Sequence, residues 1–193
     1  MKFVAIETVT EPAGLPVDVQ DFIDHARLNG LTVDRQPDLI ARELSAATRR
    51  GEQYCRRSFL TQTLSALYVP DTATDASPLY IILPRGKVQG VTSITSAGAV
   101  VDPAGYTLEW NAIKLASPLA DPATVVYDSG YGDDPADVPD GIKEGILEYA
   151  TVLYESRAGG RKLPDVDRRA MTAQGIPDGV RDLWRPYQIE ISG

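Results

Sequence analysis

Within residues 124–157, TVVYDSGYGDDPADVPDGIKEGILEYATVLYESR, the spacing of the apolar residues changes from that of a strand to that of a helix. Residues 124–127 have the β-branched and aromatic composition of a short strand. A polar loop follows from Tyr131 to Pro139, and proline suits the first turn of a helix. From Pro139 to about Arg157 the apolar residues recur at helical spacing; they are Ile142, Ile146, Tyr149, Ala150, Leu153 and Tyr154. This stretch therefore predicts a strand followed by a long amphipathic helix.

The residues before this stretch, 61–128, are predicted to form short strands. Their apolar residues alternate with polar ones or gather into compact runs bounded by Gly, Pro, Asp and Asn. Brief turns between successive strands favour an antiparallel sheet or a small barrel over βαβ units. The strand segments, about six in number, are 64–68, 79–83, 91–95, 106–110, 112–115 and 124–127.

Residues 17–59 are predicted to be helical. A first amphipathic helix begins after Pro16, and Asn29-Gly30 is a plausible stop for it. A second, longer helix follows Pro37, with apolar residues at near-helical spacing as far as Cys55. The expected fold class is α+β, a bundle of long helices (17–59 and 139–158) packed with a small antiparallel β-sheet or barrel insertion (61–128).

The two ends of the chain are predicted to be extended arms on a main domain of residues 1–160, the C-terminal arm being 161–193. Within this arm a short helical piece is expected near residues 180–184, followed by an extended stretch at 186–191. Residues 1–14 and 164–193 carry apolar or aromatic side chains in segments that cannot bury them alone. Such arms often become ordered on a partner. The alternative is that each arm packs on its own domain, and the sequence does not decide between the two.

Composition excludes several classes of protein. The formal charge of −8, from 27 acidic against 19 basic residues, argues against a protein that coats nucleic acid by neutralising phosphates. No apolar run is long enough to cross a bilayer. The start of the chain does not resemble a signal peptide. Cys55 is the only cysteine, so an intrachain disulfide is impossible and a reducing, cytosolic home is preferred.

No motif for catalysis or cofactor binding is found, and we expect neither an enzyme nor a cofactor. His25, the sole histidine, lies on an amphipathic helix and is predicted to be a packing or partly exposed residue. One histidine and one cysteine cannot build a conventional zinc site. The acidic run Asp133, Asp134, Asp137 and Asp140 lacks the spacing of a calcium loop. Dispersed carboxylates could still support acid–base chemistry, but no pair is marked.

Four arginines form the one concentrated basic feature: Arg49, Arg50, Arg56 and Arg57. At helical spacing they spread over more than one face, and a solvated or salt-bridged surface is the favoured interpretation. The alternative is a surface that contacts a neighbouring subunit or lines a channel for DNA.

Three blocks of sequence, in a fixed order over residues 15–157, carry a resemblance to a known family. The first is LPVDVQDFIDHARL at 15–28, and the second is ILPRGKVQGVTSI at 82–94. The third combines VYDSGYG at 126–132, VPDGIKEGI at 138–146 and LYESR at 153–157. Together they resemble the head–tail connector (adaptor) proteins of long-tailed phages and gene transfer agents. Asp24, Ala26, Lys87 and Ser129 depart from that family's pattern.

The resemblance implies a structural function in a virion that is assembled in the cytoplasm of a bacterial host. Connector subunits form a ring, twelve in number, between the portal protein and the stopper or tail-completion protein, and packaged DNA passes through the lumen without sequence-specific binding. No membrane is involved. In the family the C-terminal part engages the portal, and Trp, Tyr and Arg are common interface anchors. The predicted portal-binding residues are therefore Trp184, Arg185, Tyr187, Ile189 and Ile191.

Two other functions remain open. The chain could be another virion part, such as a stopper or tail-completion protein, although the long predicted helices count against a mostly β class. It could also be a hydrolase that uses dispersed carboxylates, although the sequence contains no motif that indicates one.

Overall fold

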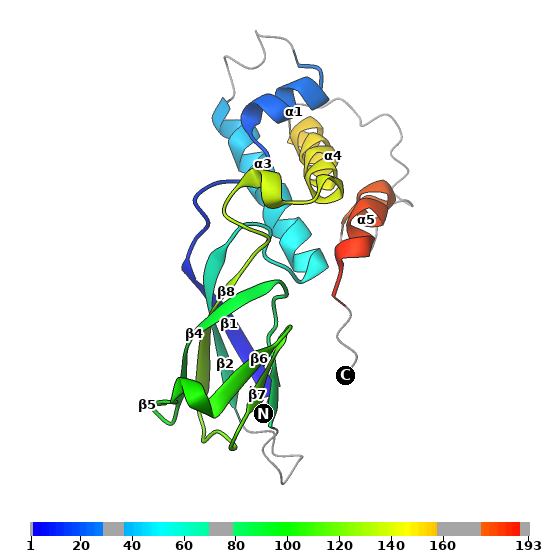
Figure 1. Ribbon diagram of the computed structural model, residues 1–193. Coiled ribbons are helices and arrows are strands. Elements are labelled where there is room, and N and C mark those ends of the chain that lie inside the picture. Colours follow the sequence, from blue (N-terminus) through cyan, green and yellow to red (C-terminus); the bar gives the residue numbers. More distant parts are fainter. Residues whose placement is uncertain (1, 29–36, 70–78, 158–174, 190–193) are drawn as a thin grey trace. The chain divides into compact units, whose positions relative to one another are not determined.

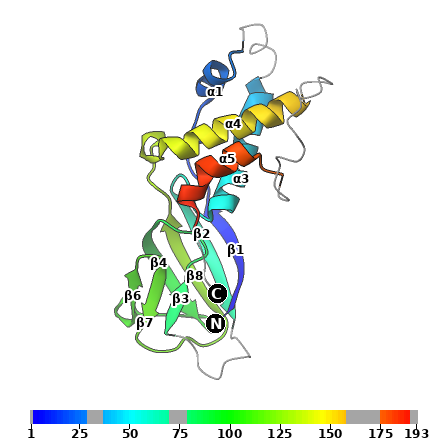
Figure 2. The ribbon, with the colours of Figure 1, turned by 90° about the vertical axis from the view of Figure 1, so that its right-hand side faces the viewer.

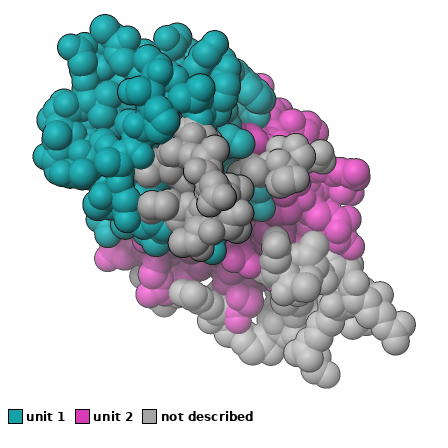
Figure 3. Space-filling model, turned by 90° about the horizontal axis from the view of Figure 1, so that it is seen from below, with its two compact units in different colours: residues 1–13, 56–133 teal, residues 14–55, 134–193 magenta. Residues whose placement is uncertain are grey.

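The computed structural model describes residues 2–28, 37–69, 79–157 and 175–189 (Figure 1). The chain divides into two compact units, which Figure 3 distinguishes by colour. A β unit comprises residues 1–13 and 56–133, and a helical unit comprises residues 14–55 and 134–193. Each unit is built from two separate stretches of sequence. Among the described residues, no helix combines the length and the apolar character needed to cross a membrane.

The described residues of the β unit form two antiparallel sheets. The five-stranded sheet has the order β1-β2-β8-β4-β5 and the three-stranded sheet has the order β3-β7-β6. The strands of the first are β1 (Lys2–Thr10), β2 (Gln62–Val69), β8 (Ala123–Ser129), β4 (Val88–Ser96) and β5 (Ala99–Val100). Those of the second are β3 (Tyr80–Ile82), β7 (Ala112–Leu115) and β6 (Tyr106–Glu109), with the short 3-10 turn η1 (Pro103–Gly105) before β6.

Side chains from both sheets form the core of this unit. In β2 and β8 every second residue is buried, as expected for strands with one face on a core. Ile81 and Leu83 from the β3 region and Ile113 and Leu115 from β7 join the same buried cluster. Burial of alternate residues therefore fixes the register of the central strands.

Two phenols lie within this core. The Tyr68 hydroxyl donates to the Ile82 carbonyl at 2.9 Å, and the Tyr127 hydroxyl accepts the backbone N–H of Arg85 at 3.3 Å. Burial raises the pKa of both phenols above the ordinary value of 10.0, and the neighbouring Tyr127 raises that of Tyr68 further. The folded chain therefore holds both protons at a pH where the unfolded chain releases them.

We expect the free energy of unfolding to fall as the pH rises above about 10. Below the pKa of the phenols in the unfolded chain, the folded and unfolded states are both protonated and the stabilisation is complete. Above that pKa, only the unfolded state loses these protons, which lowers its free energy relative to the folded state. Urea unfolding between pH 9 and pH 11.5 measures this slope. A Tyr68→Phe/Tyr127→Phe double variant should show a shallower decline. An equal slope in the variant would contradict the assignment.

The described residues of the helical unit form four helices: α1 (Val19–His25), α3 (Pro37–Cys55), α4 (Asp140–Arg157) and α5 (Asp178–Trp184). Asp18 begins α1 with a capping box, in which its side chain accepts the N–H of Asp21 and the Asp21 carboxylate accepts the N–H of Asp18. The short 3-10 turn η2 (Pro135–Asp137) precedes α4, and the short 3-10 turn η4 (Arg185–Tyr187) follows α5. Figure 2 shows α5 running beside α4.

The expected fold class is wrong. The structure is a mixed α/β fold with two antiparallel sheets of five and three strands beside four helices in its described parts, and it is no bundle of long helices with a small β insertion. The predicted N-terminal arm is strand β1, which pairs with β2. The short helix expected near residues 180–184 is present as α5, but it packs on α4, so the described C-terminal residues 175–189 are not an extended arm. Both errors arise because the partners of these segments lie far away in the sequence.

Candidate interaction surfaces

The C-terminal segment holds the predicted portal-binding residues, and the structure places its tryptophan inside the helical unit. Trp184 is fully buried, with Val180 one turn earlier on the same face of α5. Its indole N–H donates to the Ile142 carbonyl of α4 at 3.2 Å. Its ring lies 6.0 Å from that of Tyr149 and 6.2 Å from that of Tyr54. Trp184 therefore anchors α5 to the unit and offers no surface to a partner in this conformation.

The residues after Trp184 are more accessible. Arg185 is exposed, whereas Tyr187 and Ile189 are half-buried. The Tyr187 hydroxyl lies 2.8 Å from where a Cβ on Gly141 would be, so the ring rests on α4 at a residue without a side chain. The Ile189 N–H donates to the Cys55 carbonyl at 3.0 Å. Ile191 lies outside the described residues. Arg185 is therefore the predicted portal contact with the most accessible side chain.

The four arginines are divided between the two units. Arg49 and Arg50 lie on α3; Arg49 is exposed, and an Arg50 Nη1 group donates to Gln53 at 3.5 Å. Arg56 and Arg57 follow α3 in the β unit. Arg56 is exposed and has a positive φ of 54°, while the Arg57 carbonyl accepts from Arg85. Arg49 and Arg56 are the members whose side chains face solvent.

Exposed apolar side chains lie on edge strands, and only those near the N-terminus were indicated by the sequence as a contact for a partner. β1 and β3 are edge strands. Large apolar side chains on them remain accessible, namely Phe3, Val4, Val9, Tyr80 and Ile82. Trp110, between β6 and β7, is 81% exposed and has a φ of 56°, a conformation uncommon for a bulky residue. Exposed apolar edges are typical of sites that contact other chains.

Comparison with known proteins gives matches at the level of structure only. No protein-family model matches the sequence, and no curated protein matches it. Among solved structures, a chain of "Virion of native gene transfer agent (GTA) particle" has a TM-score of 0.73 at 17% identity. A chain of "Neck of empty GTA particle computed with C6 symmetry" has a TM-score of 0.71 at 18% identity. A chain of "Neck of native GTA particle computed with C12 symmetry" has a TM-score of 0.69 at 16% identity.

Each of these alignments covers 98% of this chain and 98% of the matched chain. The two-unit architecture as a whole is therefore shared, and the match is not confined to one common motif. At this level of identity the likeness establishes a shared fold.

Proposed function

We propose that this chain is a structural subunit of the neck of a phage-like particle or gene transfer agent. Its function would be that of a head–tail connector (adaptor), in which twelve copies form a ring between the portal protein and the stopper or tail-completion protein. The ring carries out no reaction, and DNA crosses its lumen without sequence-specific contacts.

The observation that carries this proposal is the full-length fold match to chains from gene transfer agent necks. The sequence blocks that resemble connector proteins also support it, because they include elements of both units. The first contains α1, the second overlaps β4, and the third overlaps β8 and α4. A match restricted to one unit would leave the other without an explanation.

The surfaces also suit a subunit of a closed ring. A ring needs two different surfaces on each subunit, so that one copy contacts the next head to tail. The chain offers apolar sheet edges in the β unit and an exposed Arg49 on α3 of the helical unit. The surface around Arg185 lies near the C-terminus and is available for a third partner.

The proposal is tested by mixing the purified chain with the portal protein of its own particle. We expect mass photometry to show a discrete complex, and negative-stain class averages to show a ring of twelve copies. A chain that stays monomeric and does not bind the portal would contradict the proposal. A ring that binds a tail protein but not the portal would favour a stopper.

Two arginine variants distinguish the contact with the portal from the contact between ring subunits. Arg185→Ala should weaken portal binding by about tenfold, the order expected for the loss of an interface arginine, while ring formation persists. Arg49→Ala should weaken contacts between ring subunits by a similar factor while the C-terminal contact is kept. Biolayer interferometry on immobilised portal, together with mass photometry of the rings, distinguishes these outcomes. Equal effects of both variants in both measurements would refute the assignment of the two surfaces.

A further inference from the structure

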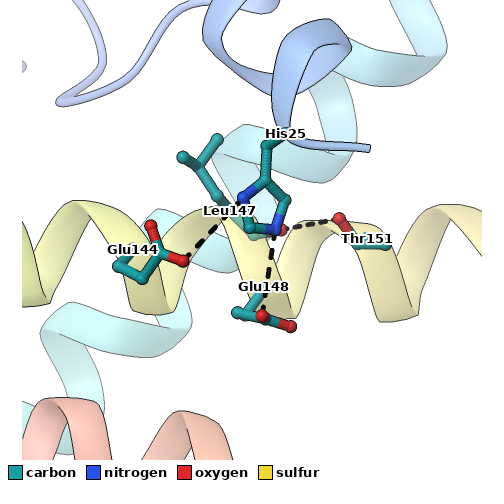
Figure 4. A network of polar contacts seen from close by, with 5 residues as sticks. All are labelled: His25, Glu144, Leu147, Glu148 and Thr151. Carbon is teal, nitrogen blue, oxygen red and sulfur yellow. Dashed lines mark hydrogen bonds and ion pairs between the residues drawn. The ribbon is translucent and has the colours of Figure 1, made fainter. Parts of the chain in front are cut away.

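His25 lies between two carboxylates of α4, a cluster that the proposed function does not use (Figure 4). The imidazole is at the end of α1, and Glu144 and Glu148 are one turn apart on α4. The His25 Nδ1 is 3.9 Å from a Glu144 oxygen, and the His25 Nε2 is 3.9 Å from a Glu148 oxygen. One ligand atom from each of the three residues lies within 4.8 Å of the other two.

The arrangement places like charges together. Two glutamates at positions i and i+4 of a helix repel one another and destabilise it unless a positive charge lies between them. A neutral imidazole can donate through only one ring nitrogen, so it satisfies one carboxylate and presents a lone pair to the other. Both separations of 3.9 Å exceed hydrogen-bond length. The two carboxylates therefore face different nitrogens of the ring without hydrogen-bonding to it, so a shared ion requires one carboxylate to move toward the nitrogen that binds it.

We propose that His25, Glu144 and Glu148 bind a divalent transition-metal cation such as Zn²⁺ or Mn²⁺. One imidazole nitrogen and carboxylate oxygens are the donors that such ions take at about 2.0–2.2 Å. The carboxylate side chains are 52% and 51% exposed, so they are free to move toward the ion, while the less exposed imidazole, at 22%, fixes its position. Water completes the coordination.

The bound ion has a structural consequence. It joins the end of α1 to the middle of α4, two helices that are distant in sequence. The free energy of binding adds to the stability of the helical unit, because the three ligands come together only in the folded chain. This inference does not depend on the proposed function, and neither experiment decides the other.

Calorimetry on the full-length chain without a histidine tag tests the site. We expect one Zn²⁺ to bind per chain and the melting temperature to rise by about 4 °C or more at saturating zinc. Glu144→Gln and Glu148→Gln should each weaken binding by about tenfold or more. Glu155→Gln, an exposed glutamate of the same helix outside the cluster, is the matched control and should leave the affinity unchanged.

The single histidine of the chain supplies an unambiguous second readout. Long-range ¹H–¹⁵N spectra of the imidazole should show one ring nitrogen shifting when Zn²⁺ is added at constant pH. The absence of binding at millimolar Zn²⁺ would overturn the proposal and leave a simple ion pair. Binding that is unchanged in both glutamine variants, without movement of the imidazole signal, would overturn it in favour of a site elsewhere.

Discussion

Trp184→Ala is expected to destabilise the helical unit by about 3–5 kcal/mol, the range for removing a large aromatic side chain from a core. The indole is fully buried, and it is one of the largest side chains in the interior. The substitution also leaves the Ile142 carbonyl without the indole N–H that it accepts. Urea unfolding followed by far-ultraviolet circular dichroism measures the change.

The other tryptophan of the chain supplies the matched control. Trp110 is 81% exposed, so Trp110→Ala should change the free energy of unfolding by less than about 0.5 kcal/mol. The Trp110→Ala chain also reports on Trp184 alone, whose fluorescence emission should be that of an indole shielded from water. Equal effects of the two substitutions on stability would show that α5 is not packed as described.

This result bears on function, because Trp184 is also among the residues predicted to bind the portal. Loss of portal binding in Trp184→Ala would follow from the release of α5 and would not identify a direct contact. Arg185→Ala changes an exposed side chain and is therefore the cleaner test of that surface. We therefore assign Trp184 the role of holding α5, and with it the C-terminal surface, in position.

Gly145→Ala is expected to destabilise the same interface by about 1–3 kcal/mol, the usual cost of adding a methyl group to a filled space. A Cβ at Gly145 would lie 2.7 Å from the Trp184 Cδ1 and 2.8 Å from its Cε2, closer than van der Waals contact allows. Alanine is better than glycine in a helix by about 1 kcal/mol, so the steric clash has to outweigh that gain. Because the indole is held on several sides, it cannot move away cheaply.

Gly179→Ala on α5 is the control with the opposite expected sign. A Cβ at Gly179 would meet no atom within 4 Å. The substitution should therefore be neutral or stabilise the chain by up to about 1 kcal/mol through helix propensity. Thermal unfolding of both variants under the same conditions compares them. A stabilising Gly145→Ala would mean that α5 does not approach α4 closely at this residue.

The candidate site could be predicted only in part. The C-terminal arginine and aromatic residues were identified by residue type, and residue type does not reveal burial. Val180 and Trp184 are four residues apart on α5, which is the spacing of a buried face, but the helix is too short for that signal to stand out from its surroundings. The cluster around His25 could not be anticipated, because its members are on two helices distant in the sequence.

The sequence alone determined most of the local elements, with β1 as the main exception. The apolar spacing after Pro37 and after Pro139 predicts helices where α3 and α4 lie, and the alternation in residues 61–128 predicts strands. These signals are local, since each depends on residues a few positions apart. Only the tertiary structure decided which strands pair, that β1 completes the five-stranded sheet, and that α5 closes on α4 over Gly145. Such contacts join segments far apart along the chain, and their free energy comes from a shared buried surface that no single segment displays.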